Sequence, residues 1–112
     1  MQLSEKKCIP CERGDIDALS CSDVQKSFTE HEASLQGWQL NDTCTRIILE
    51  KIFPDFVTAM EFVNQVAELA EQEGHHPDIG IWYNRVVLDM WTHSIGGLSE
   101  NDFILAAKIN QK

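Results

Sequence analysis

The rest of the chain is arranged around Glu71–Asp102, the stretch EQEGHHPDIGIWYNRVVLDMWTHSIGGLSEND. Within it, Gly74 follows a helical pattern and can adopt the left-handed conformation that ends a helix. Pro77 biases the residue before it toward extended geometry. The two histidines between these breakers, His75 and His76, are therefore predicted to lie on a short and stiff loop.

An alternating pattern after this loop predicts one β-strand over residues 81–92. Its more apolar face carries Trp82, Val86, Leu88 and Met90. The other face leads to a third histidine, His93, which is expected to leave the strand on the less apolar side. Only folding can bring this imidazole to the other two.

A helix start closes the stretch. Ile95-Gly96-Gly97 predicts a turn, and the run from Ser99 to Asp102 resembles a capping box, in which the acidic residue supports the first turn of a helix. If the three histidines meet, they are expected to meet beside this helix start.

The segments before this stretch predict a helix and a hairpin. A capping pair of Ser22 and Gln25 predicts the start of a first helix, which Gly37 is expected to end. Asn41-Asp42 supplies turn chemistry, so the residues around it, 38–53, are predicted to form a β-hairpin.

A second helix is predicted to begin at Pro54 and to pack on the sheet through a wide apolar stripe. That stripe consists of Ala59, Met60, Phe62, Val63, Val66, Ala67, Leu69 and Ala70. With a final helix after Ser99, the order of elements is α-β-β-α-β-α. Such an order predicts an α+β domain, in which an antiparallel or mixed sheet has helices packed on one face.

The length of 112 residues, with 43% hydrophobic and 24% charged residues, suits a single domain with one core. Residues 1–19 are expected to form an irregular arm and residues 20–112 the domain. A three-stranded sheet leaves two edges that could pair with another copy, so a homodimer or homotetramer is predicted, formed by sheet extension or by helix packing.

The formal net charge of −9 limits the possible partners. Nucleic-acid backbones recruit lysine and arginine, of which the chain has nine, so direct binding of DNA or RNA is not expected. The same charge disfavours an anionic membrane surface. Because no apolar run is long enough to span a bilayer and the N-terminus lacks an apolar signal core, the expectation is a soluble, cytoplasmic protein.

Four cysteines, Cys8, Cys11, Cys21 and Cys44, leave three interpretations open. Cys8 and Cys11 have the two-residue spacing of zinc and redox motifs, but no second such pair follows them. The thiols are structural, or they form a metal or disulfide site with a third cysteine, or they are a catalytic redox pair.

The three histidines of the central stretch have the chemistry for an elimination of water. Histidine gives or takes a proton near neutral pH, so one imidazole can protonate a leaving oxygen while another group accepts a proton. Two alternatives stay open for the pair His75 and His76. They could be ordinary loop residues, or part of a zinc site, although adjacent residues in an extended segment point in opposite directions. Tyr83 and Trp91 could stack on a planar ring or simply cover the sheet.

The spacing of these residues closely resembles the signature of the pterin-4a-carbinolamine dehydratase family. The signature is carried by Glu71, His75-His76-Pro77, Tyr83, His93 and Asp102, and the similarity extends over about residues 20–110. The resemblance implies the same order of elements and a dehydration that uses no metal or other cofactor. The implied substrate is a 4a-hydroxytetrahydropterin, released by aromatic amino acid hydroxylases, which loses water to give the quinonoid dihydropterin.

The resemblance also implies the roles of the site residues. His75 and His93 would be the acid and base that assist departure of the hydroxyl, with His76 holding the pterin and sharing in proton transfer. Glu71 and Asp102 would orient the imidazoles. The implied substrate-binding residues are His75, His76, Pro77, Thr92, His93, Ser94 and Ile95.

A protein of this fold could also act without catalysis. Some members of the family serve as dimerisation partners of a homeodomain transcription factor, so the alternative function is an oligomeric interaction module that contacts protein. The presence of all three histidines and both carboxylates favours the enzyme, because a protein that had given up catalysis would be free to lose any of them.

Overall fold

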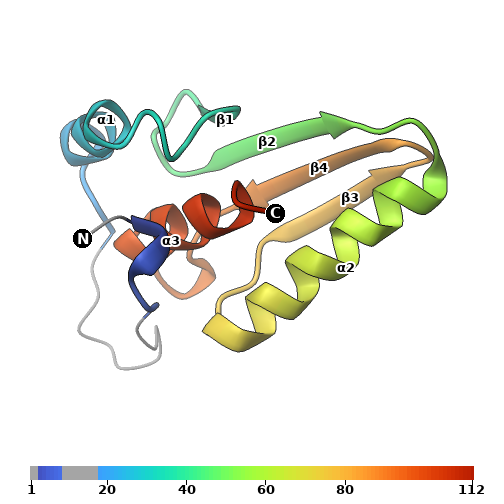
Figure 1. The fold of residues 1–112 in the computed structure, drawn as a ribbon. Coiled ribbons are helices and arrows are strands. Elements are labelled where there is room, and N and C mark those ends of the chain that lie inside the picture. The colour runs from blue at the N-terminus through green and yellow to red at the C-terminus, as the bar shows by residue number, and fades with distance from the viewer. Residues whose placement is uncertain (1–2, 9–17) are drawn as a thin grey trace.

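The computed structural model describes residues 3–8 and 18–112. In this part of the chain, three α-helices accompany one antiparallel sheet with the strand order β1-β2-β4-β3 (Figure 1). The elements are α1 (Cys21–Glu30), β1 (Trp38–Leu40), β2 (Ile47–Ile52), α2 (Phe56–Glu73), β3 (Asp78–Trp82), β4 (Arg85–Met90) and α3 (Glu100–Ile109), with 3-10 helices at Leu3–Glu5 and His93–Ile95. The predicted α+β class, with helices against an antiparallel sheet, is confirmed.

One face of the sheet forms a wall of the hydrophobic core. Ile47 of β2 lies opposite Met90 of β4, and Leu49 lies opposite Leu88. All four side chains are buried. Helices α2 and α3 cover this face (Figure 1) and supply buried side chains, among them Ala59, Phe62, Val66, Phe103 and Leu105. Of the stripe predicted on α2, Ala67 proves exposed.

The single strand predicted over residues 81–92 is a hairpin of two strands, β3 and β4. The chain reverses at Tyr83 and Asn84, where Tyr83 has a φ of 54°. The Nδ2 of Asn84 donates to the Phe53 carbonyl (2.9 Å), and the Phe53 N–H donates to the Asn84 carbonyl (2.8 Å). The residue with positive φ is not a glycine, and the alternation of apolar and polar residues continues through the turn, so the sequence pattern did not indicate it. Trp82 consequently lies on β3 and is 55% exposed, outside the core.

The first helix begins at Cys21, and the capping pair predicted at Ser22 and Gln25 is wrong. Ser20 is the N-cap, and its hydroxyl oxygen accepts a hydrogen bond from the Asp23 N–H (3.1 Å). The sequence shows an equally suitable serine two positions later, so propensity could not choose between them. The helix ends at Glu30, and turns follow it up to Gly37.

The loop between β1 and β2 is longer than the two-residue turn predicted there. Asn41 Oδ1 accepts hydrogen bonds from the N–H groups of Thr45 (2.9 Å) and Arg46 (3.0 Å). Cys44 in this loop has a φ of 59°. Because one amide side chain holds the loop from inside, β2 starts only at Ile47.

The two ends of α2 are capped, and its C-terminal end leads into the loop of residues 74–77, which we call the histidine loop. Asp55 is the N-cap and accepts a hydrogen bond from the Thr58 N–H (2.8 Å), which holds the pKa of the Asp55 carboxyl below its usual range. At the other end Gly74 adopts the left-handed conformation (φ 65°), and this predicted helix stop is confirmed. The residue after it, His75, donates its backbone N–H to the Ala70 carbonyl (3.1 Å), which completes the turn.

The cysteines pair in a way that their spacing did not indicate. A disulfide joins Cys21 of α1 to Cys44 in the loop before β2, with Cα atoms 5.1 Å apart. Cys8 is a free, half-buried thiol, and Cys11 lies outside the described residues. Burial, followed by the nearby Glu73 carboxylate, raises the pKa of Cys8 to about 12. The Cys8 thiol therefore stays protonated at neutral pH and is a poor nucleophile.

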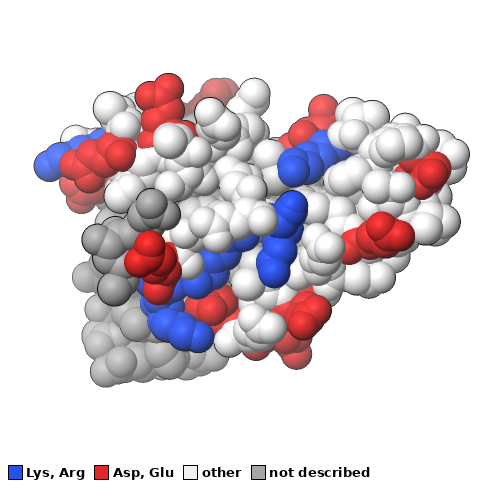
Figure 2. Space-filling view, in the orientation of Figure 1, with Lys and Arg blue, Asp and Glu red and all other residues white. Residues whose placement is uncertain are grey.

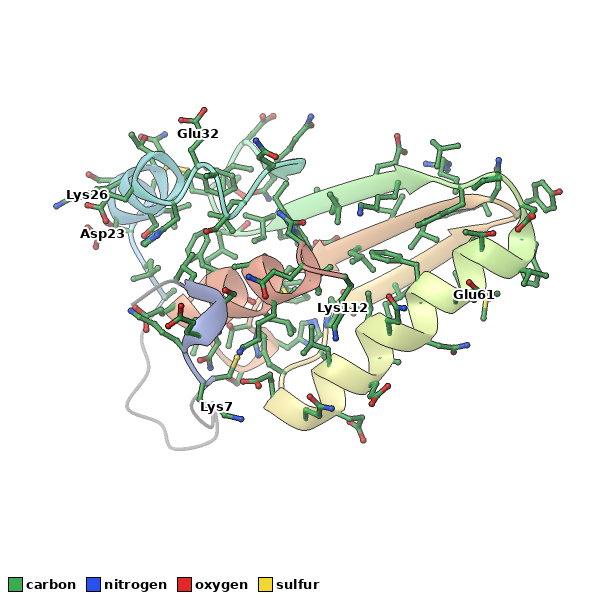
Figure 3. The ribbon with its side chains drawn as sticks, viewed as in Figure 1. Lys7, Asp23, Lys26, Glu32, Glu61 and Lys112 are labelled. Carbon is green, nitrogen blue, oxygen red and sulfur yellow. A yellow bond between two sulfur atoms is a disulfide. The ribbon has the colours of Figure 1, made fainter. Side chains whose placement is uncertain are left out.

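Charged side chains of both signs lie at the surface. They are interspersed over the face shown in Figure 2, which offers no continuous basic surface among the described residues there. Asp23, Lys26 and Glu61 point away from the domain (Figure 3). Across the described ranges, every helix is too short or too polar to cross a membrane.

Candidate active site

The histidine loop and the residues after β4 meet at one end of the sheet. The antiparallel register places Asp78, the first residue of β3, opposite Asp89 near the end of β4. Residues that precede β3 therefore lie beside residues that follow β4. Together they form a pocket of about 170 Å³, lined by Gly74, His75, His76, Trp91, Thr92, His93 and Ser94.

His75 is held by a buried carboxylate. Its Nε2 lies 2.7 Å from Oδ1 of Asp102, and the two side chains are 5% and 0% exposed. The Oδ2 of Asp102 accepts hydrogen bonds from the Thr92 hydroxyl (2.7 Å) and the Ser99 backbone N–H (2.9 Å). Because an ionised carboxylate only accepts, the Nε2–H of His75 is the donor. This bond fixes both the tautomer and the orientation of the ring.

Asp102 serves the helix start and the site with the same side chain. It is the acidic member of the capping box with Ser99 at the start of α3, as the sequence predicted. A negative charge in the first turn of a helix is favoured by the partial positive charge of the unpaired N–H groups. The capping role and the imidazole-orienting role therefore coincide, and one does not exclude the other.

His76 lies on the open side of the pocket. Its Nε2 contacts Oε2 of Glu71, which belongs to the last turns of α2, before Gly74 turns the chain back. The side chains of His76 and Glu71 are 56% and 78% exposed. An exposed pair of this kind contributes about 0–1 kcal/mol to stability, so its main effect is on the position of the imidazole.

His93 faces a carboxylate that the sequence did not single out, Asp78. The Nε2 of His93 lies 3.5 Å from Oδ1 of Asp78. The indole N–H of Trp91 donates to Oδ2 of the same carboxylate (3.0 Å). The only sequence signal for Asp78 was its place directly after Pro77, and the hairpin register that brings it to His93 was hidden by the missed turn.

Three other residues lie apart from the pocket lining. Pro77 is buried and Ile95 is half-buried, and neither lines the pocket, so their part in binding stays a prediction. Tyr83 is 66% exposed at the opposite end of the β3–β4 hairpin, so it cannot stack on a ring bound in this pocket. Trp91 does line the pocket, so its predicted stacking on a planar ring stays a prediction.

The three histidines share one pocket but do not form a metal-binding cluster. Within residues 3–8 and 18–112, no three histidine, cysteine, aspartate or glutamate residues are placed to hold a metal ion. Each imidazole instead turns its Nε2 toward a carboxylate of its own, Asp102, Glu71 or Asp78. The hydrogen bonds to Asp102 and Glu71 orient His75 and His76, and the Asp78 carboxylate faces His93 at 3.5 Å, an arrangement that suits directed proton transfer.

Known proteins resemble this chain in sequence and fold. A family model described as Pterin 4 alpha carbinolamine dehydratase matches residues 17–112. A protein of Rickettsia canadensis (strain McKiel) whose name places it with the pterin-4-alpha-carbinolamine dehydratases is 46% identical over 110 residues, which cover 98% of this chain and 96% of the relative.

Two further matches widen the comparison. Pterin-4-alpha-carbinolamine dehydratase 2, mitochondrial, of Arabidopsis thaliana is 41% identical over 112 residues, which cover 97% of this chain and 58% of the plant protein. A crystal structure from Brucella melitensis, described as a transcriptional coactivator/pterin dehydratase, superposes with a TM-score of 0.74 at 36% identity. That match covers 85% of this chain and 97% of the Brucella chain.

Proposed function

This chain belongs to the pterin-4a-carbinolamine dehydratase family, and on that premise we propose how its histidine pocket carries out the dehydration. The enzyme is a hydro-lyase that removes water from a 4a-hydroxytetrahydropterin and leaves the quinonoid dihydropterin. The observation that carries the proposal is the meeting of His75, His76 and His93 around one pocket, each with a carboxylate against its Nε2.

The reaction needs two proton transfers and no change of oxidation state. The bond between C4a and the hydroxyl oxygen breaks, and a double bond forms between C4a and N5. One proton reaches the departing hydroxyl and one leaves N5, so the balance is the loss of one water molecule. Imidazole side chains can give or take a proton near neutral pH, so one ring can donate while another accepts.

His75 and His93 share the acid and base roles in this proposal. His75 is buried and its ring is fixed by Asp102, whereas His93 reaches the same pocket from the 3-10 turn after β4. Protons can therefore be given and taken at two walls of one pocket. His76, exposed and paired with Glu71, holds the pterin ring and assists the transfer.

The lining residues around the imidazoles supply the substrate contacts. Thr92 and Ser94 border the pocket together with His75, His76 and His93. The Thr92 hydroxyl is engaged by Asp102, its backbone N–H by the Gly97 carbonyl (2.8 Å) and its carbonyl by the Ile95 N–H (3.2 Å), so Thr92 contributes mainly the shape of the pocket wall. Pro77 and Ile95, which are neighbours of lining residues in the chain, complete the proposed set. The test is to follow dehydration of a 4a-hydroxytetrahydropterin: acceleration over the spontaneous reaction supports the proposal, and none contradicts it.

We expect metal chelators to leave the rate of dehydration unchanged, because the proposed proton transfers use only imidazoles and carboxylates. The measurement is the initial rate before and after incubation with EDTA followed by gel filtration. Activity lost on chelation and regained with added zinc would contradict the metal-free mechanism and restore the zinc interpretation of the histidines.

The proposed assembly is a homodimer or homotetramer formed by extension of the sheet. β3 is an edge strand that carries exposed Ile79 (36%), Ile81 (37%) and Trp82 (55%). An exposed apolar edge is a ready partner for a second copy. Light scattering at micromolar concentration is expected to give a multiple of the 12.7 kDa chain mass, and a monomeric mass would count against this assembly.

The proposed source of the substrate and the proposed compartment both depend on the proposed substrate. An aromatic amino acid hydroxylase is the proposed source of the 4a-hydroxytetrahydropterin, and the cytoplasm is the proposed compartment for this small, water-soluble substrate. The Brucella protein is described as a transcriptional coactivator as well as a pterin dehydratase. A non-catalytic interaction module would not need three imidazoles paired with carboxylates, so the enzyme is the better supported function.

A further inference from the structure

We propose that Asp78 orients the His93 ring for proton transfer, and that Trp91 and Arg46 hold the side chains of Asp78 and His93 in position. This inference rests on the proposed function. It concerns four side chains, Arg46, Asp78, Trp91 and His93, which we call the Asp78 cluster.

His93 lacks the tight support that His75 has. His75 is fixed by burial and by a 2.7 Å contact with Asp102. The side chain of His93 is 50% exposed and its Nε2 lies 3.5 Å from Asp78 Oδ1, just beyond an ordinary hydrogen bond. A half-exposed ring loses orientational freedom only if its neighbours fix it, so the carboxylate that His93 faces is the natural orienting group.

Asp78 is itself held in place. The indole N–H of Trp91 donates to Asp78 Oδ2 (3.0 Å), which leaves Oδ1 turned toward His93. The Trp91 and His93 rings pack edge to face, with centroids 4.2 Å apart and planes at 78°. Trp91 therefore contacts both members of the pair and sets the distance between them.

Trp91 is supported in turn by Arg46. The Arg46 guanidinium lies 4.5 Å from the centroid of the Trp91 ring, and its Nη1 bonds Asp89 Oδ2 (2.9 Å). A guanidinium on an indole face is an attractive arrangement. Arg46 immediately precedes β2, Trp91 follows β4 and Asp78 opens β3, so three neighbouring strands place the cluster.

These contacts assign Asp78 the part for His93 that Asp102 has for His75. In each pair a carboxylate faces Nε2, which favours the Nε2–H form and directs the other ring nitrogen to exchange protons with substrate. Asp78 is not among the residues that line the pocket. It acts through His93, so its loss is expected to slow the chemical step and leave substrate binding largely intact.

The central test compares Asp78→Asn with wild type. Asparagine keeps the size and an acceptor for Trp91 but removes the charged oxygen that faces His93. We expect kcat to fall about tenfold, the order of one charge-assisted contact, with KM within about twofold. Asp78→Glu, which restores a carboxylate, is expected to recover most of kcat. The matched control is Glu50→Gln, which removes an exposed carboxylate from its ion pair with Arg85 (2.7 Å) on β2 and β4 and is expected to act like wild type.

A second pair of variants tests the route through Trp91. Trp91→Phe keeps an aromatic ring beside His93 and under Arg46 but removes the N–H bond to Asp78, so a smaller fall in kcat is expected. The double variant Asp78→Asn/Trp91→Phe is expected to be no slower than Asp78→Asn alone, because Trp91 acts on His93 through the Asp78 carboxylate, which the first change has already removed. Effects on kcat that multiply would overturn this coupling.

The outcomes separate this inference from the proposed function. If wild type accelerates dehydration and Asp78→Asn keeps full kcat, or raises KM alone, the positioning role is overturned and the proposed function stands. If wild type itself fails to accelerate the reaction, the proposed function fails first. A glutamate variant no faster than Asp78→Asn would also overturn the role of the carboxylate. Urea unfolding of each variant should stay near wild type, because Asp78 and His93 are half exposed.

Discussion

Replacing His75 with alanine is expected to lower the rate of dehydration by about 100-fold or more, the usual loss when a general acid or base is removed. His75 is the pocket imidazole with the best-defined position, since it is buried and bonded to Asp102 at 2.7 Å. The same burial means that alanine would also leave a cavity and an unpaired carboxylate. A slow His75→Ala enzyme alone would therefore not separate chemistry from structure.

His75→Gln provides that separation. A glutamine amide can place an N–H near the position of the imidazole Nε2 and so keep a donor for Asp102, but it transfers no proton near neutral pH. We expect His75→Gln to be nearly as slow as His75→Ala while its circular dichroism and unfolding midpoint stay closer to wild type. The control is His31→Gln, at the end of α1 and outside the pocket lining, which should act like wild type. A His75→Gln enzyme within threefold of the wild-type rate would contradict the acid–base role.

The second large effect is expected at Asp102, where removal of one carboxylate disturbs folding and catalysis together. Asp102 is fully buried and accepts hydrogen bonds from His75, Thr92 and Ser99. Asp102→Ala leaves these donors without their acceptor in the interior, which is expected to lower the free energy of unfolding by about 3–5 kcal/mol. Because domains of this size are stable by only about 5–15 kcal/mol, such a loss is easily measured in urea.

Asp102→Asn tests the two roles of this carboxylate against each other. Asparagine fills the same space but offers one acceptor oxygen and one N–H₂ group, so it cannot satisfy donors on both sides. We expect a smaller loss of stability than for alanine, about 1–3 kcal/mol, and still a large fall in rate, because His75 would be held in another tautomer. An Asp102→Ala protein with wild-type stability would show that the buried network contributes little.

Much of the site was accessible from the sequence because its signals are local. The helix stop at Gly74, the stiff loop before Pro77 and the capping box at Ser99 each depend on a few neighbouring residues. Tertiary packing, including that of α2 against α3, then brings His75 to Asp102, which lies 27 residues later in the chain. The chemistry of imidazole predicted an elimination of water, and the family resemblance predicted the substrate and the roles of the site residues.

The missed features depend on register and on distant partners. The β3–β4 turn uses Tyr83 at positive φ without a glycine, so the alternating pattern ran through it unbroken. The pairing of His93 with Asp78 follows from that hairpin and could not be found without it. The Cys21–Cys44 disulfide joins segments whose approach is set by the Asn41 loop, and no spacing rule predicts it.

The most direct test of the proposed dehydration is the rate at which the purified protein accelerates loss of a chemically generated 4a-hydroxytetrahydropterin, followed by absorbance beside the spontaneous reaction and the His75→Gln variant. We predict that wild type clearly exceeds the spontaneous rate and that His75→Gln loses about 99% or more of that acceleration. Equal rates for a folded wild-type protein and the spontaneous reaction would contradict the dehydratase function.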